Sequence, residues 1–298
     1  MDNIKSTYDS IASSSFGIFV VSCIILYVVV RFIIYIMQYS LTTGLANGVP
    51  LVPGKLIGSQ TYKVKQQVGG DAIVGLSSDE QHGIEFTYSV WLKVNPDNFI
   101  DESKYDISSC DFSNNCATHE VLHIFNKGDD SNTTNSYNTA GSTYEGAPDG
   151  ISLINNGPGV YLARYEKEVV ILIYMDTIGN EPSVKKKPII VRNMPIVKWF
   201  SLILIAKSNV LYVYINGRLK HSKLFTDEVF KQNYDDINVN TSGVNWGDLS
   251  SLTYFPRALN GLEIQASVLA GPDRKKRIDT TTKFDESPSY LSSNWYAN

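Results

Sequence analysis

The stretch VKWFSLILIAKSNVLYVYINGRLK, residues 197–220, decides the fold class of this chain. Residues 199–206 are apolar on both faces, which is typical of a strand buried in the centre of a sheet. Residues 210–215 form a second apolar run, and Asn216-Gly217 follows it directly. An Asn-Gly pair between two strand-like runs is the strongest short-range signal for a β-hairpin, so the stretch predicts neighbouring antiparallel strands.

Strand patterns continue on the N-terminal side of this stretch. In residues 86–94, apolar side chains alternate with Thr87, Ser89 and Lys93, which is the period of a strand with one buried face. Residues 168–176 are again apolar on both faces. We therefore expect an all-β fold in which antiparallel strands form a two-layered sandwich.

One short helix is expected on the C-terminal side. Asn260 is a suitable N-cap, and Glu263 stands where it would complete a capping box. Gly271 and Pro272 end the run. We expect this helix to lie on a sheet, with one face that carries Leu262, Ala266 and Leu269.

The N-terminal part of the chain carries a much longer apolar run, FGIFVVSCIILYVVVRFIIYIM, from Phe16 to Met37. Its only charge is Arg31, and at 1.5 Å per residue the run matches a hydrocarbon core of about 30 Å. A secretory signal would have a shorter apolar region and a small-residue cleavage site. We expect a single transmembrane helix over residues 16–39, with Arg31 and Tyr35 reaching toward its C-terminal interface. The flanking charges leave its orientation open.

The other segments complete the expected domain plan: a tail over residues 1–15, an extended connector over 40–77, a domain over 78–271 and a second tail over 272–298. The connector is rich in Gly and Pro, and the second tail is polar without an apolar period. A basic run and late aromatic residues in that tail are typical of a segment held by a partner. These candidate partner-binding residues are Arg274, Lys275, Lys276, Arg277, Tyr290, Trp295 and Tyr296.

Composition excludes some functions. The chain has 26 basic and 30 acidic side chains, a net charge of −4, so no whole-protein field attracts nucleic acid. Three cysteines are too few for a disulfide scaffold. Cys110 and Cys116 lie in one polar loop, where they either close a small disulfide ring or remain two thiols.

Five segments follow one another in the order of laminin-G-like jelly rolls. They are EFTYSVWLKVN, HIFNKGDD, DGISLINNGPGVYLARY, the stretch at 197–220 and LTYFPRALNGLEIQASVLAGP. In this respect residues 78–271 resemble the concanavalin A-like lectin/glucanase superfamily, which implies a jelly-roll sandwich but not a function. Catalytic members carry an E-x-D-x-x-E carboxylate set. Here Glu80 and Glu85 have no Asp between them, so we expect no enzyme.

One motif points toward metal chemistry. His119, Glu120 and His123 form a literal H-E-x-x-H, which on a helix would hold zinc beside a general base. On a strand the two histidines would stand about 13 Å apart and could not bind one ion. The polar segment before the motif favours the strand, so we expect no metal and no cofactor. Calcium would need the acidic loop residues Asp129, Asp130 and Asp149, which lack a regular spacing.

Two functions fit this plan. A membrane anchor joined to a jelly-roll domain without catalytic motifs loosely resembles membrane-associated structural proteins of large DNA viruses. That resemblance implies a minor capsid protein at the interface of a virion inner membrane and its capsid, with the lipid bilayer and other structural proteins as partners. The alternative is a membrane-anchored lectin or adhesion module at a cell surface, with glycan as its partner. Stacking of sugars would then involve Trp91, Trp199 or Trp246, which packing in the core explains equally well.

Overall fold

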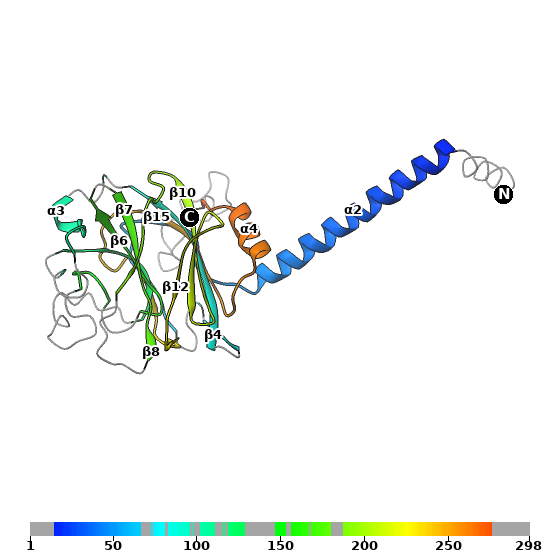
Figure 1. Cartoon of the computed structure of the whole chain (residues 1–298). Coiled ribbons are helices and arrows are strands. Elements are labelled where there is room, and N and C mark those ends of the chain that lie inside the picture. Colours follow the sequence, from blue (N-terminus) through cyan, green and yellow to red (C-terminus); the bar gives the residue numbers. More distant parts are fainter. Residues whose placement is uncertain are drawn as a thin grey trace, which may run out of the picture.

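This computed structural model describes residues 15–66, 72, 74–80, 83–95, 97, 102–110, 116, 119–128, 147–152, 156–166, 168–179 and 187–275. Two antiparallel sheets pack face to face, and a long helix, α2 (Ser15–Ala46), stands away from them (Figure 1). The expected all-β sandwich preceded by an apolar helix is therefore confirmed.

The first sheet contains the stretch that decides the fold. The predicted strands over residues 86–94, 199–206 and 210–215 are all present, and Asn216 and Gly217 take the positive φ angles of 49° and 74° that a tight hairpin turn needs. The strand order is β1 (Val49–Ile57), β15 (Gly247–Phe255), β4 (Gly83–Val94), β10 (Trp199–Lys207), β11 (Val210–Ile215) and β12 (Arg218–Leu224), with β3 (Ser78–Glu80) paired to β4.

The second sheet faces the first across the core. Its order is β2 (Tyr62–Val64), β14 (Ile237–Val239), β5 (Leu122–Lys127), β6 (Gly159–Tyr165), β7 (Glu168–Tyr174) and β9 (Ile189–Val191). Strand β7 is the predicted strand that begins at Glu168. Beside this sheet lie the short pair β8 (Thr177–Gly179) and β13 (Glu228–Phe230) and the one-turn helix α3 (Glu102–Tyr105). Both sheets contribute apolar side chains to one continuous core, among them Leu92, Phe125, Ile171, Leu204 and Trp246.

Strand β4 is buried on both faces, although its alternation predicted only one buried face. The reason is helix α4 (Gly261–Ala270), which covers the polar side of β4. The Ser89 hydroxyl hydrogen-bonds the Ser267 hydroxyl at 3.2 Å, and the Thr87 hydroxyl donates to the carbonyl of Arg257 at 2.8 Å. The small polar side chains of this face therefore connect β4 to α4 and to the turn before it.

The expected connector over residues 40–77 differs from the structure. Helix α2 continues to Ala46, β1 begins at Val49, and both β1 and β2 are paired inside the sandwich. Pro50 and Pro53 do not prevent this, because β1 is an edge strand and its pairing with β15 is interrupted by bulges in this region. The sandwich thus begins at Val49, directly after the helix.

Candidate functional site

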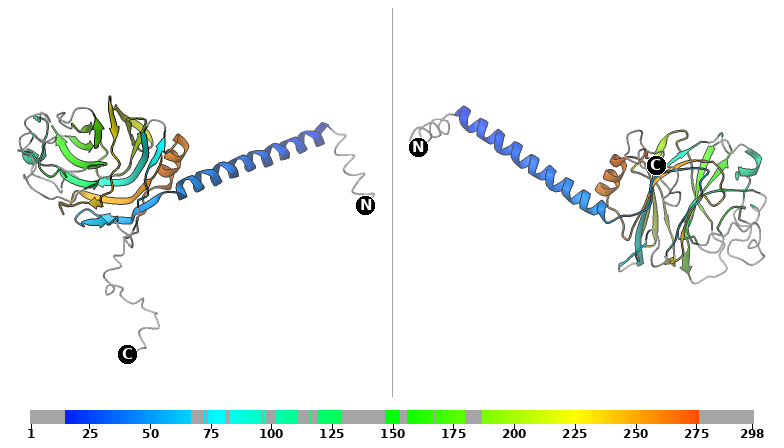
Figure 2. Two further views of the ribbon diagram at one scale, coloured as in Figure 1. Left: turned by 90° about the horizontal axis from the view of Figure 1, so that it is seen from below. Right: turned by 180° about the vertical axis from the view of Figure 1, so that it is seen from behind.

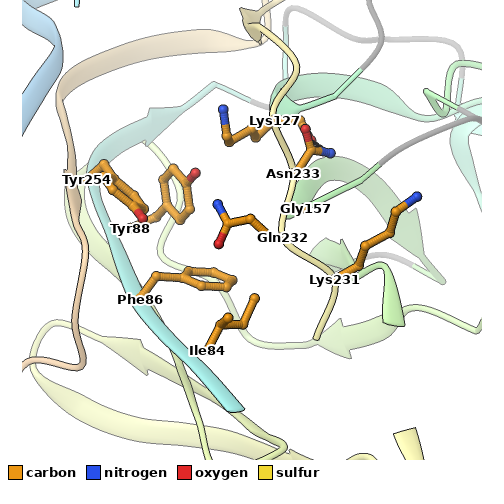
Figure 3. Close-up of a pocket in the computed structure, with 9 residues that line it drawn as sticks. All are labelled: Ile84, Phe86, Tyr88, Lys127, Gly157, Lys231, Gln232, Asn233 and Tyr254. Atoms are coloured by element: carbon orange, nitrogen blue, oxygen red, sulfur yellow. Dashed lines mark hydrogen bonds between the residues drawn. The ribbon is translucent and has the colours of Figure 1, made fainter. Parts of the chain in front are cut away.

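A small pocket opens where β4 and β15 approach the segment after β13 (Figure 3). Its free volume is about 10 Å³, roughly the room that one water molecule needs. The chain itself engages the polar groups around it, since the Ser77 hydroxyl donates to Gln232 and the Tyr254 hydroxyl donates to the carbonyl of Gly75 at 3.1 Å. The lining residues are Ile84, Phe86, Tyr88, Lys127, Gly157, Lys231, Gln232, Asn233 and Tyr254.

One of the two lysines that line this pocket, Lys127, is also held by the chain. The ammonium group of Lys127 donates to the carbonyl of Asp235 at 2.7 Å, and the amide of Asn233 donates to the carbonyl of Lys127 at 3.0 Å. Burial lowers the pKa of Lys127 to about 8, against the opposing effect of the Asp235 and Asp236 carboxylates. The pocket is therefore a packed joint of the sandwich that has no room for a sugar ring.

The H-E-x-x-H motif does not form a zinc site. His123 lies on β5 as predicted, whereas the prediction that His119 also lies on a strand is wrong, because β5 begins only at Leu122. The Nδ1 atom of His123 accepts from the backbone N–H of Thr241 at 3.1 Å, which leaves Nε2–H to donate to Asn126 at 2.9 Å. Burial lowers the pKa of His123 to about 4, so the ring is neutral at physiological pH.

The other members of the motif have structural contacts of their own. Glu120 forms an ion pair with Lys104 at 2.6 Å, and the His119 ring hydrogen-bonds the Ser109 hydroxyl at 3.2 Å. The side chains in the described parts of the chain include no group of three or more His, Cys, Asp or Glu placed to hold a metal. Of the proposed calcium ligands, Asp149 pairs through its backbone with Val121 and His119. Asp129 and Asp130 lie outside the described residues.

The three tryptophans do not form a sugar-stacking platform. Trp91 and Trp246 are buried, and Trp199 is half-buried at the start of β10. Sequence reasoning did not single out Tyr234, which is the more exposed aromatic side chain at 71% and follows the pocket residues Gln232 and Asn233. The polar residues around it in sequence, Lys231, Asn233 and Asp235, indicate that Tyr234 lies on a polar surface.

Cys110 and Cys116 lie side by side without a covalent bond between them. Cys110 is half-buried, Cys116 is buried, and a hydrogen bond between the two thiols lowers the pKa of Cys110. A disulfide between them stays a prediction.

Helix α2 is the candidate membrane site. Within the described residues, Gly17–Ile36 is the one helical segment long and apolar enough to cross a bilayer, and its side chains are almost entirely exposed. Arg31 and Tyr35 are exposed on it. Phe16 and Met37 belong to the same helix, but their side chains lie outside the described part of the structure. Figure 2 shows from two further sides that the helix projects clear of the sandwich.

The basic run after α4 is only partly described. Arg274 and Lys275 are exposed, and the segment that carries them lies along the first sheet. The carbonyl of Lys275 accepts from the N–H of Lys55 on β1 at 2.8 Å, and the carbonyl of Asp273 accepts from the Ser250 hydroxyl on β15 at 2.6 Å. The remaining candidate partner-binding residues, Lys276, Arg277, Tyr290, Trp295 and Tyr296, lie outside the described residues.

Comparison with known proteins gives no family. No protein-family description matches the chain, and no curated protein matches it. Among solved structures, the receptor-binding domain of botulinum neurotoxin D is similar at 15% identity and a TM-score of 0.39, over 74% of this chain and 46% of that one. The binding domain of Paraclostridial Mosquitocidal Protein 1 is similar at 14% identity and a TM-score of 0.40, over 74% and 45%. The chain thus spans about half the length of these domains, and such similarity carries no argument about a ligand.

The fold and the exposed helix together define the class of protein. It is an antiparallel β-sandwich with an exposed apolar helix joined to its first strand.

Proposed function

We propose that this protein is a membrane-anchored, non-enzymatic connector, in which α2 spans a bilayer and the sandwich binds a partner outside it. The observation that carries the proposal is the junction between helix and sandwich. Only Asn47 and Gly48 separate α2 from β1, and the N–H of Gly48 donates to the carbonyl of Leu45 at 3.1 Å. Leu45 packs against the cluster that contains Phe255 and Ile264. The sandwich is therefore held close to the bilayer rather than carried on a flexible linker.

The polar interior supports a non-enzymatic role. Catalytic groups are found with perturbed pKa values in open clefts. Here two of the buried groups with strongly shifted pKa values, His123 and Lys127, are both held by hydrogen bonds with other groups of the chain. The others are tyrosines whose pKa values are raised chiefly by burial, which keeps their hydroxyls protonated: Tyr88, Tyr161, Tyr174 and Tyr254. Glu85, a carboxylate considered above, lies 3.8 Å from the ammonium group of Lys207. These groups stabilise the sandwich and leave no open acid–base pair at the pocket.

More specifically, we propose that the connector is a structural protein that links an inner membrane to a protein shell, as in a virus particle. A short, packed junction suits a link of fixed length. The polar tail begins beside β1, where the carbonyl of Lys275 accepts from the N–H of Lys55, and the two described residues of its basic run, Arg274 and Lys275, are exposed. The tail would then dock on the shell through Arg274 and the residues that follow.

A deletion tests this role. Removing residues 280–298 should leave a protein that folds and resists alkaline carbonate extraction from membranes, but that no longer joins the assembly. The complete chain with the single substitution Cys110→Ser is a matched control and should be incorporated into the assembly normally. Normal incorporation of the deleted chain would refute the docking role of the tail, and extraction of the complete chain by carbonate would refute the anchor.

One observation favours a second candidate, a glycan-binding module. Tyr234 presents an exposed ring next to the exposed Asp235 in sequence, and aromatic rings with nearby hydrogen-bonding groups are suited to bind sugars. The surface is shallow, because the adjacent pocket has room for only about one water molecule. Binding to a glycan array that is lost in Tyr234→Ala, but kept in Tyr212→Ala, would favour this candidate over the structural role.

A further inference from the structure

Helix α4 has an apolar outer face that the sandwich does not cover. Its inner face holds Ile264 and Val268 against the first sheet. Leu262, Ala266 and Leu269 follow one another at spacings of four and three, so they share the opposite face. Leu262 is 58% exposed and Leu269 is 86% exposed. The three residues share one face, as the sequence indicated, and that face points away from the sheet.

Charge is almost absent from α4. Its one charged residue is Glu263, and both carboxylate oxygens accept from the Arg257 guanidinium, at 2.6 and 2.9 Å. A surface helix that meets only water normally carries charged residues on its outer face. The outer face of α4 instead presents leucine, alanine and Gln265, whose amide donates to the carbonyl of Gly217 at 2.9 Å.

The helix lies beside the membrane anchor. The Leu45 side chain at the end of α2 packs into the same cluster as Val268 and Ile264 of α4. Figures 1 and 2 show α4 on the side of the sandwich from which α2 leaves. Basic side chains flank it, because Arg218 follows the turn that Gln265 contacts, and Arg274 and Lys275 follow α4 in sequence. Asp273 is the exposed acid in this segment.

We propose that the outer face of α4 is a second membrane contact, which rests on the headgroup region of the same bilayer that α2 spans. This inference rests on the proposed membrane anchor. An interfacial helix buries its apolar face at the boundary of headgroups and acyl chains, and adjacent basic side chains favour anionic lipids. The contact would fix the orientation of the sandwich, which a single spanning helix leaves free to rotate.

This contact requires a tilt of α2. Residues 37–46 of α2 rise about 15 Å beyond the apolar span at 1.5 Å per residue. The headgroup region occupies about 5–8 Å of that height on each side of the hydrocarbon core, so the end of an upright α2 lies about 7–10 Å above the headgroups. Transmembrane helices tilt by about 20° on average, and a tilt of α2 toward α4 brings this side of the sandwich nearer to the headgroups.

Site-specific fluorescence in vesicles tests the proposal on the complete chain. In a Cys23→Ala, Cys110→Ala background, where the remaining Cys116 is buried, Leu269→Cys carries an environment-sensitive dye on α4. Leu224→Cys, at a site that is 63% exposed on β12, is the matched control. In phosphatidylcholine–phosphatidylserine vesicles, we expect nitroxide lipids to quench the dye at position 269 several-fold more than the dye at 224.

The quenching results distinguish the second membrane contact from other arrangements of α4. Equal, weak quenching at both positions would overturn the second contact, and so would a blue-shifted dye at 269 that nitroxide lipids do not quench. The latter result would mean that a second copy or the chain's own tail covers α4. Carbonate extraction of the same vesicles keeps the two proposals apart. A chain that stays in the membrane without quenching at 269 retains the anchor and loses the contact, whereas a chain that carbonate releases loses the anchor.

Discussion

Replacing Glu263 should destabilise the sandwich by an amount that can be divided between two interactions. Its carboxylate accepts from the backbone N–H of Asn260 at 2.9 Å, which is half of the capping box, and from the Arg257 guanidinium at 2.6 and 2.9 Å. Glu263→Ala removes both interactions. Glu263→Gln keeps an oxygen for Asn260 and loses the charge.

The magnitudes follow from these contacts. Loss of an N-terminal capping interaction costs about 1 kcal/mol. Hydrogen bonds to charged groups contribute about 1.5–3 kcal/mol, and the partly exposed Arg257 side chain places this pair near the lower end. We expect a decrease in the free energy of unfolding of about 2–3 kcal/mol for Glu263→Ala and about 1–2 kcal/mol for Glu263→Gln. For a domain of this size, 1 kcal/mol corresponds to about 2–4 °C in Tm.

The pH dependence gives an independent check. The hydrogen bonds from Arg257 hold the pKa of Glu263 below its usual range. A carboxylate with a lowered folded pKa stabilises the protein above its unfolded pKa of about 4.3, and this contribution is lost as pH falls through the folded pKa. The difference between the unchanged chain and Glu263→Gln should therefore be complete at pH 7 and shrink in acid.

Thermal unfolding in detergent micelles, followed by the fluorescence of the buried Trp246, measures these differences. Arg257→Met closes a double-mutant cycle with Glu263→Gln and isolates the coupling energy of the pair. Equal Tm values for the alanine and glutamine variants would contradict the division into two interactions. A coupling energy near zero would refute the contribution of the ion pair.

Further predictions concern other parts of the chain. Burial lowers the pKa of His123 in the folded protein to about 4, so its neutral ring stabilises the fold fully above pH 6.5 and this stabilisation is lost as pH falls toward 4. His123→Gln should therefore flatten the decline of Tm between pH 7 and 5. An unchanged slope would contradict the buried neutral ring. Gly48→Ala places a methyl group about 2.6 Å from the Phe255 ring and should cost about 1–3 kcal/mol, whereas an unchanged Tm would show that the junction is loose. Removing residues 280–298 should leave Tm within about 2 °C, since surface changes rarely exceed about 0.5 kcal/mol, and a larger drop would mean that the tail folds back on the sandwich. Tyr234→Ala should likewise leave the unfolding free energy within about 0.5 kcal/mol, and a loss above 1 kcal/mol would show that the ring packs on the domain.

The sequence predicted the elements whose signals are local. The Asn216-Gly217 turn specifies its own hairpin through two positive φ angles, and the Asn260–Glu263 capping box specifies the start of α4. The segment over residues 49–64 was expected to belong to an extended connector, because it is rich in Gly and Pro and because Pro50 and Pro53 forbid a continued helix. Its pairing partners, β15 and β14, lie about 170 to 205 residues away in sequence (Val64 pairs with Ile237, and Val49 with Tyr254), and no local pattern encodes such pairing.

The candidate site was harder to predict than the fold. The H-E-x-x-H sequence is the same whether its histidines bind zinc or are buried and neutral. Only the hydrogen bonds of His123 with Thr241 and Asn126 distinguish the two cases. The outward direction of Leu269 could not be read from helical spacing either, since spacing shows which residues share a face but not which face meets the sheet. The polar neighbours of Tyr234 in sequence indicate a surface position, but the extent of its exposure is known only once the loop after β13 is placed.

The attachment of Lys275 to β1 has a mechanical consequence. Helix α2 leads into β1, which begins at Val49, and the start of the tail is hydrogen-bonded to Lys55, near the other end of the same strand. If a partner holds the tail while a membrane holds the helix, tension runs along the length of one edge strand. The first bonds to carry that load are the one from the N–H of Lys55 to the carbonyl of Lys275 and the one from the Ser250 hydroxyl to the carbonyl of Asp273. The core between the two sheets stays outside the path of the force.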